Sequence, residues 1–207
     1  MERRHVFISY HHKNDQYYKN ELIRLNNEHN IFMDMSVDTG DISDDLSDQE
    51  IREIIRDKYL KTTSVLILLV GTETKNRKHI DWEIYSSMYD GKVNKKTGIL
   101  IITLPSIESI IRASDDEVKK NIFPDIKSWR SITTRAEYEK IYPNLPARII
   151  DNLLKKDVKI NIVSWNRIYN DIEGLKFLID KAYKDKSYNN YDLSRKMRRK
   201  NTEGENN

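Results

Sequence analysis

The chain has 207 residues, with 36 Lys and Arg against 33 Asp and Glu and no cysteine. This length fits one domain, or one domain with an appendage. The absence of cysteine excludes a disulfide framework, a Cys-ligated metal site and a thiol nucleophile. No run approaches the roughly 18 apolar residues of a membrane span, and the apolar run after His5 is too short for a signal peptide. We therefore expect a soluble, cytoplasmic protein with no membrane partner.

Five short runs of apolar residues stand out along the chain. They are rich in β-branched residues and leucine and do not alternate with polar residues, which is typical of strands buried on both faces of a parallel sheet. The predicted strands are residues 5–10, 31–35, 64–70, 98–104 and, more weakly, 158–163.

Segments with apolar residues at helical spacing lie between these runs. The predicted helices are residues 15–29, with Asp15 as the N-cap, and residues 48–61, 79–89, 146–155 and 171–184. Repeated alternation of strand and helix predicts an α/β fold: a doubly wound, mainly parallel five-stranded sheet with helices on both faces.

Three segments depart from this alternation. Residues 37–48 form an acidic loop with five aspartates, and residues 105–144 are longer than a crossover needs, so we expect an irregular or partly helical insertion. Beyond about Tyr188 the periodicity is lost. Residues 181–200 hold eight Lys and Arg against two Asp, so the basic pI of about 8.8 belongs to this end of the chain. We expect a domain at 1–186 and a basic, flexible tail at 187–207.

Polar residues follow the carboxyl ends of the predicted strands, where open parallel sheets bind ligands. Each of them alone is better explained by a turn or a cap, but together they favour a pocket along one edge. They are Ser9, Tyr10, His11 and His12, then Asp34 and Ser36, then Gly71 and Thr72, and finally Thr103.

Glu83, on the helix after the third predicted strand, lies near the same edge. It has two interpretations, a surface acid paired with Lys78 or His79, or a catalytic acid. Spacing alone favours the first.

Several functions of this architecture are excluded. The first predicted strand is not followed by Gly-x-Gly-x-x-Gly, and the chain contains no P-loop and no Gly-x-Ser-x-Gly nucleophile elbow. The acidic pair and phospho-accepting aspartate of a receiver domain are also missing. We predict no metal site, because no two histidines stand four residues apart on a helix; His11 and His12 with Asp15 are the remaining alternative. Nucleic-acid binding would rest on the basic tail alone.

Three stretches of the sequence resemble the TIR domain, in particular the bacterial TIR-like branch of Thoeris antiphage defence. They are Val6-Phe-Ile-Ser-Tyr10, the acidic loop after Asp34-Met-Ser36, and Leu68-Leu-Val-Gly-Thr72 leading to Asn76-Arg77 and Asp81-Trp-Glu-Ile84. The resemblance covers about residues 5–105 well and continues loosely through Pro143–Arg148 and the helix after Trp165. One departure is His79, which stands where many TIR domains have a tryptophan.

The resemblance implies an enzyme that cleaves the nicotinamide–ribose bond of NAD, with Glu83 as the catalytic residue. It implies NAD as substrate, no further cofactor and no metal. Ser9, Tyr10 and His11 would border the nicotinamide-ribose pocket. Further contacts to NAD are expected from Asp34, Asn76, Arg77 and Trp82, with a structural ion pair as the alternative role of Arg77.

The function implied for a Thoeris TIR protein is synthesis of a cyclic or histidine-conjugated ADP-ribose messenger when phage infects. Its partners would be a phage-derived trigger, a separate messenger-dependent effector, and other copies of the TIR domain. In many TIR proteins the loop matching 37–48 helps to build an active site between subunits; a solvated loop is the alternative. Two other functions stay open: an NADase that depletes NAD, and a non-catalytic TIR interaction module.

Overall fold

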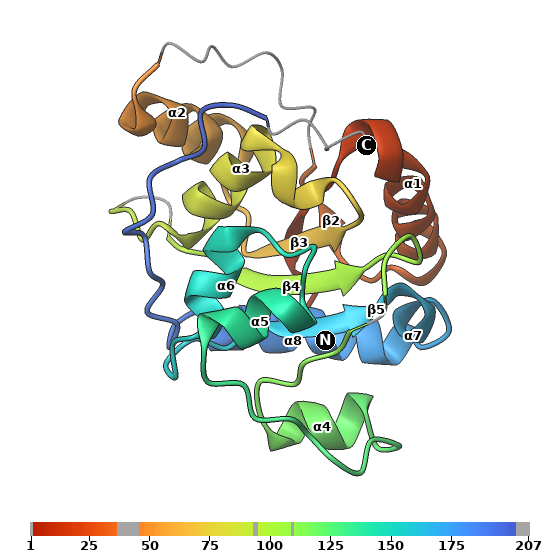
Figure 1. Ribbon diagram of the computed structural model, residues 1–207. Helices are drawn as coiled ribbons and strands as arrows, with labels where there is room; N and C mark the ends of the chain where they lie inside the picture. Colours follow the sequence, from red (N-terminus) through yellow and green to blue (C-terminus); the bar gives the residue numbers. More distant parts are fainter. Residues whose placement is uncertain (1, 37–45, 93–94, 109, 202–207) are drawn as a thin grey trace.

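The computed structural model describes residues 2–36, 46–92, 95–108 and 110–201 (Figure 1). Five strands form one sheet in the order β2-β1-β3-β4-β5, and all neighbouring pairs are parallel. The strands are β1 (His5–Ser9), β2 (Met33–Asp34), β3 (Val65–Val70), β4 (Gly98–Thr103) and β5 (Asn161–Ser164). Every residue of β3 and β4 is buried, as expected for the centre of a sheet covered on both sides.

Helices cover both faces of the sheet, which confirms the predicted doubly wound α/β class (Figure 1). Phe7 of β1 faces one apolar cluster, whereas Val6 and Ile8 face the other. The Phe7 side carries α2 (Asp48–Ile54), the π-helical turn η1 (Ile55–Tyr59), α3 (Lys78–Met88), α5 (Arg135–Ile141) and α6 (Ala147–Leu153). The other side carries α1 (His12–His29), α4 (Asp116–Ile122), α7 (Trp165–Tyr169) and α8 (Ile172–Asp185).

The start of α1 differs from the prediction. The helix begins at His12 with His11 as its N-cap, so Asp15 is not the cap but a residue within the first turns. Asp15 is buried, only 2% exposed. An aspartate near a helix start usually caps it from the surface; here the chain leaving β1 enters the helix three residues earlier, which turns Asp15 inward.

The C-terminal segment also differs from the prediction. Residues 188–201 are not a frayed tail but pack along α6 and α3 (Figure 1), with Tyr191 and Met197 in the core cluster of that face. Asn189 is fully buried and donates to the Tyr191 hydroxyl, which in turn donates to the Thr97 carbonyl. The four apolar residues of this segment, Tyr188, Tyr191, Leu193 and Met197, follow neither helical nor strand spacing, so the sequence carries no sign of this packing. Residues 202–207 lie outside the described residues, and the division at 186 stays a prediction.

The insertion at 105–144 contains two short helices, α4 and α5, within irregular chain, in agreement with the prediction. It also covers the outer edge of the sheet, because Arg112 exchanges both backbone hydrogen bonds with Ile162 of β5, each 2.9 Å long. Of the acidic loop, residues 37–45 lie outside the described residues. Its last part leads into α2, where Ser47 and Glu50 form a capping box.

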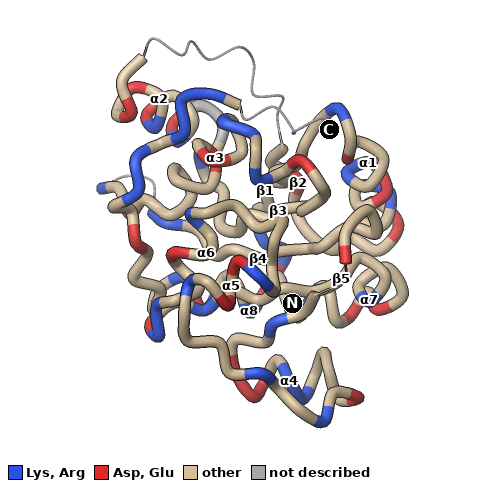
Figure 2. The backbone as a smooth tube through the Cα atoms, in the orientation of Figure 1, with Lys and Arg blue, Asp and Glu red and all other residues tan. Residues whose placement is uncertain are grey.

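Lys and Arg lie along many helices and loops of the described chain and not only near its C-terminus (Figure 2). No helix in the described residues is both long and apolar enough to cross a membrane.

Candidate active site

The centre of the site is a hydrogen bond between β1 and α3. Ser9 is the last residue of β1, and its hydroxyl donates to Oε2 of Glu83 at 2.6 Å. Both side chains are buried, with Glu83 5% exposed. A buried carboxylate requires polar partners, and a short O–H···O⁻ bond is a strong one. The interpretation of Glu83 as a surface acid is therefore wrong.

The packing of α3 explains why Glu83 is buried. Ile80, Trp82 and Ile84 all belong to the apolar core between α3 and the sheet, so three of five consecutive residues face inward. A helix that buries so wide a face also buries the residue between Trp82 and Ile84. The carboxylate then reaches the carboxyl end of β1, where it accepts the hydrogen bond from the Ser9 hydroxyl.

A small cavity of about 20 Å³ borders Glu83. This volume holds one water molecule; it is far too small for a dinucleotide. Its polar walls are Tyr10, His12, Lys19 and Ser36. Tyr10 stacks on His12 with ring centroids 4.5 Å apart. Lys19 was not among the predicted site residues. It follows His12 by two helical turns, and that spacing places it on the same face of α1.

Three of the predicted site residues gather beside the loop after β3. Arg77 pairs with Glu73 at 3.1 Å, and the Asn76 amide donates to the same carboxylate at 3.4 Å. His11 lies close enough that Arg77 lowers its pKa, although burial is the larger cause. Its Nδ1 is buried without a hydrogen-bond partner among the described residues. Arg77 thus forms a structural ion pair, with Glu73, which is the role that the sequence offered as the alternative to binding NAD.

The other two predicted contacts to NAD, Asp34 and Trp82, do not belong to the group formed by His11, Asn76 and Arg77. Asp34 is exposed on the edge strand β2, where its carboxylate accepts the Ser36 backbone N–H at 2.9 Å. Trp82 is 0% exposed, and its indole N–H donates to the Arg198 carbonyl at 2.7 Å. The structure therefore makes Trp82 a core residue that holds the C-terminal segment, and its assignment as a ligand contact is not supported.

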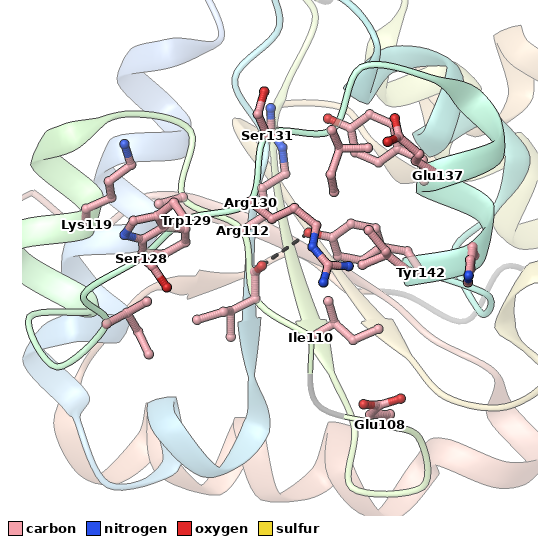
Figure 3. Close-up of a pocket in the computed structure, with 17 residues that line it drawn as sticks. Glu108, Ile110, Arg112, Lys119, Ser128, Trp129, Arg130, Ser131, Glu137 and Tyr142 are labelled. Atoms are coloured by element: carbon pink, nitrogen blue, oxygen red, sulfur yellow. Dashed lines mark hydrogen bonds between the residues drawn. The ribbon is translucent and has the colours of Figure 1, made fainter.

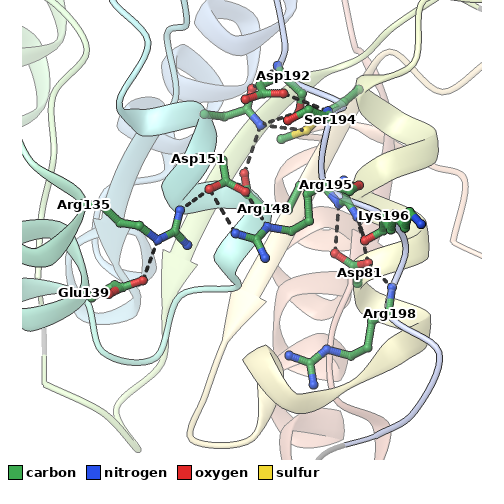
Figure 4. A network of polar contacts seen from close by, with 12 residues as sticks. Asp81, Arg135, Glu139, Arg148, Asp151, Asp192, Ser194, Arg195, Lys196 and Arg198 are labelled. Atoms are coloured by element: carbon green, nitrogen blue, oxygen red, sulfur yellow. Dashed lines mark hydrogen bonds and ion pairs between the residues drawn. The ribbon is translucent and has the colours of Figure 1, made fainter.

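The C-terminal segment is tied to α3 two residues before Glu83 (Figure 4). Arg148 of α6, fully buried, forms a bidentate pair with Asp81 through bonds of 2.9 and 3.0 Å. Asp81 also accepts the Arg198 backbone N–H at 2.8 Å. Arg148 donates in addition to the carbonyls of Arg195 and Lys196. The helix that carries Glu83 is therefore fixed from both α6 and the chain terminus.

Asp15 is a second buried carboxylate at this edge of the sheet. It contacts the backbone after β3, because a Cβ on Gly71 would lie only 2.7 Å from Asp15 Oδ1. Oδ2 has no hydrogen-bond partner among the described residues. Burial raises the pKa of Asp15 to about 6, and the His11 backbone N–H opposes this only in part. Folding thus shifts Asp15 towards its protonated form, relative to the unfolded chain.

Replacing Asp15 by asparagine is expected to stabilise the protein at neutral pH. The pKa of Asp15 is higher in the folded state than its ordinary 3.8, so ionisation disfavours folding above pH 6 and has no effect well below pH 4. The expected gain in the free energy of unfolding is about 2–3 kcal/mol at pH 7.5, decreasing as the pH falls from 6 to 4. Urea unfolding of both proteins at pH 7.5, 6 and 4.5 measures this; a difference independent of pH would contradict it.

A larger cavity, of about 1210 Å³, lies between the walls of the insertion (Figure 3). Arg112, Trp129 and Tyr142 line it, and the Tyr142 hydroxyl donates to the Ile111 carbonyl at 3.2 Å. It contains none of the predicted site residues. Within the described residues, no three His, Asp or Glu side chains are grouped closely enough to hold a metal ion.

The parallel sheet in the order β2-β1-β3-β4-β5, with a serine at the end of β1 bonded to a buried glutamate of α3, has the doubly wound arrangement shared by flavodoxin-like and TIR-like proteins. Residues 7–109, about half of the chain, match the model of the TIR-like domain of the Thoeris protein ThsB. The chain belongs to this family, which places it among the TIR proteins of antiphage defence. No curated protein matches the chain.

Proposed function

We propose that this protein cleaves the bond between nicotinamide and ribose in NAD, with Glu83 as the catalytic residue. The observation that carries the proposal is the buried Glu83 carboxylate, oriented by the Ser9 hydroxyl at the carboxyl edge of the sheet. Carboxylates act in this way in glycoside cleavage, where the ribose or sugar ring passes through an oxocarbenium-like transition state.

The chemistry requires little besides this carboxylate. Nicotinamide leaves as a neutral molecule, so no general acid has to protonate it. The positive charge that develops on the ribose is stabilised by a fixed negative charge nearby. Ser9 contributes by holding Glu83 in one orientation, which lowers the cost of reorganisation in the transition state.

The described part of one chain encloses a cavity of only about 20 Å³ beside Glu83. A dinucleotide therefore needs further space and further contacts. We propose that a neighbouring copy of the chain completes the substrate site through TIR surfaces, so that catalysis requires self-association. His11, Asn76 and Arg77 lie at the same edge and are the proposed contacts to the nucleotide.

We further propose that the product is an ADP-ribose-derived messenger, cyclic or conjugated to histidine, which activates a separate effector after phage infection. The match to the Thoeris ThsB domain supports this role in defence. The reaction transfers the ADP-ribosyl group from nicotinamide to an internal atom, to histidine or to water, and the acceptor determines which product forms.

The test is incubation of the full chain with NAD, with and without free histidine, followed by mass spectrometry of the nucleotides. Glu83→Gln keeps the size of the side chain and removes its charge, so we expect release of nicotinamide to fall by about 100-fold or more. Glu28→Gln makes the same chemical change on the exposed face of α1 and is expected to leave the rate unchanged.

The outcomes separate the alternatives. A cyclic or conjugated product supports the messenger, whereas free ADP-ribose alone supports an NADase that depletes NAD. Full activity of a folded Glu83→Gln protein would overturn the assignment of the catalytic residue. No consumption of NAD by the concentrated wild-type protein, including samples in which it self-associates, would favour a non-catalytic TIR module.

A further inference from the structure

A separate cavity lies at the opposite edge of the sheet from Glu83. It has a volume of about 750 Å³, and its walls are the start of β1, the turn before β3, the segment before β4 and the end of α8. Since all strands are parallel, these segments meet at the amino ends of the strands; we call this cavity the amino-edge pocket. Six of its lining residues are cations: Arg3, Arg4, Arg56, Lys61, Lys95 and Lys186.

Only part of this positive charge is neutralised. Among the described residues that line the pocket, Glu2 is the one acid. Arg4 pairs with Glu2 at 3.1 Å and with Asp180 at 2.8 Å, and Lys95 lies 3.9 Å from Asp90. Three of the cations form no ion pair within the described residues, namely Arg3, Lys61 and Lys186.

Two of the cations are withdrawn from water, which makes their mutual repulsion stronger. Arg56 is 5% exposed and donates to the Ser86 carbonyl at 2.8 Å; burial lowers its pKa to about 10. Burial also lowers the pKa of Lys186, and the positive charges of Arg4 and Arg56 lower it further. A bound anion would relieve this repulsion.

The wall of the pocket formed by residues 60–64 is fixed in an unusual conformation. Thr62 has a φ of 69°, a left-handed conformation that β-branched residues rarely adopt. The turn is held because Thr63 donates its backbone N–H to Leu60, and Ser64 donates to His5 of β1 at 2.9 Å. Strained residues of this kind persist where the surroundings hold them and are frequent at ligand sites.

The aromatic ring in the pocket, that of Tyr183, already contacts two cations. The guanidinium of Arg4 lies 3.8 Å from the centre of the Tyr183 ring, and the ammonium of Lys186 lies 4.4 Å from it. The ring is therefore not available to stack on a base, as proteins that bind single-stranded nucleic acid require. The recognition that the pocket offers is by charge.

We propose that the amino-edge pocket binds a small molecule that carries two or more phosphate groups. The volume lies within the usual range for small-molecule sites. A guanidinium matches phosphate oxygens in a bidentate way, and lysine adds a point charge, so the lining can bind several phosphate oxygens at once. This site is independent of NAD cleavage at Glu83, because it lies at the other edge of the sheet.

The test is isothermal titration of the full chain with inorganic pyrophosphate at low salt. We expect one pyrophosphate per chain, bound more tightly than inorganic phosphate. Lys186→Gln is expected to weaken binding by about tenfold and Lys61→Gln, at an exposed position, by about threefold. Lys120 is an exposed lysine of α4 that forms no ion pair with any other described residue. Lys120→Gln makes the same change outside the pocket and should alter affinity less than twofold. Glu83→Gln should bind pyrophosphate as the wild type does.

Three outcomes would overturn the proposal. The first is no binding of pyrophosphate at millimolar concentration by the folded wild-type protein. The second is an equal loss of affinity in Lys120→Gln, which would indicate attraction by net charge alone. The third is tighter binding of a single-stranded oligonucleotide than of pyrophosphate, lost in Lys186→Gln, which would make the pocket part of a nucleic-acid surface. None of these outcomes depends on whether NAD is cleaved.

Discussion

Replacing Arg148 by methionine is expected to lower the free energy of unfolding by about 3–5 kcal/mol. Arg148 is fully buried and forms both bonds of its bidentate pair with Asp81 inside the protein. Methionine fills a similar volume but leaves Asp81 with a buried charge and without its cation. Removing one partner of a buried pair costs more than the pair itself contributes, because the desolvation of the remaining charge is no longer compensated.

The loss of stability in Arg148→Met should extend to the C-terminal segment, residues 188–201. Arg148 donates to the carbonyls of Arg195 and Lys196 at 2.8 and 3.1 Å, so its removal leaves these two groups unpaired as well. We expect residues 188–201 to become accessible to proteases in Arg148→Met before the domain unfolds. Limited proteolysis with mass spectrometry measures this, and urea unfolding measures the stability.

A double variant distinguishes the effect of the ion pair between Asp81 and Arg148 on stability from the effect of side-chain packing. In Asp81→Leu with Arg148→Met, no charge is left buried, so we expect it to be more stable than Arg148→Met alone. Arg24→Met, at an exposed i,i+4 pair on α1, serves as the control and should change stability by less than about 1 kcal/mol. A change of less than 1 kcal/mol in Arg148→Met, or a double variant less stable than that single variant, would show that the pair does not fix α3.

Replacing Gly98 by alanine is expected to destabilise the protein by about 3 kcal/mol or more, or to prevent folding. Gly98 is the first residue of β4, directly beneath the end of α8. A Cβ at this position would lie 2.0 Å from the Ala182 carbonyl oxygen and 2.4 Å from its carbon. Both atoms belong to the backbone of a packed helix, so the helix would have to move away from the sheet.

The control for Gly98 is Gly174, at the start of α8. A Cβ on Gly174 would meet the carboxylate of Asp171 at 2.2 Å, but that carboxylate is the end of a side chain and can rotate away. Its rotation loses the hydrogen bond that caps α8, which costs about 1 kcal/mol. Soluble expression and thermal unfolding of both variants check this; an unchanged melting temperature of Gly98→Ala would contradict the close contact of α8 and β4.

The sheet was predictable from sequence because its strands are buried on both faces. Residues 65–70 and 98–103 are continuous apolar runs, and such runs occur where helices cover a parallel sheet on both sides. The edge strand β2 is shorter than predicted, since Ile31 and Phe32 are buried before the strand and only Met33 and Asp34 pair with β1.

The predictions that were wrong concern single residues, or a segment with few apolar residues, whose environment is set by contacts with distant parts of the sequence. Asp15 is an aspartate near the start of a helix, as an exposed N-cap would be. In the folded protein it is instead packed against Gly71, more than fifty residues away in the sequence. Trp82 stands next to Glu83 and was predicted to contact NAD, but its indole N–H donates to the Arg198 carbonyl. Local spacing carries no information about either contact.

The sequence by itself determined the class of fold, the order of its elements and Glu83 as the candidate catalytic residue, because buried strands and the quoted motifs are local features. Only the tertiary structure decided that Glu83 is bonded to Ser9, that the C-terminal segment holds α3 in place, and that six cations meet at the amino edge of the sheet. These features join residues far apart in the chain, and their energies depend on burial, which exists only after the helices have packed on the sheet.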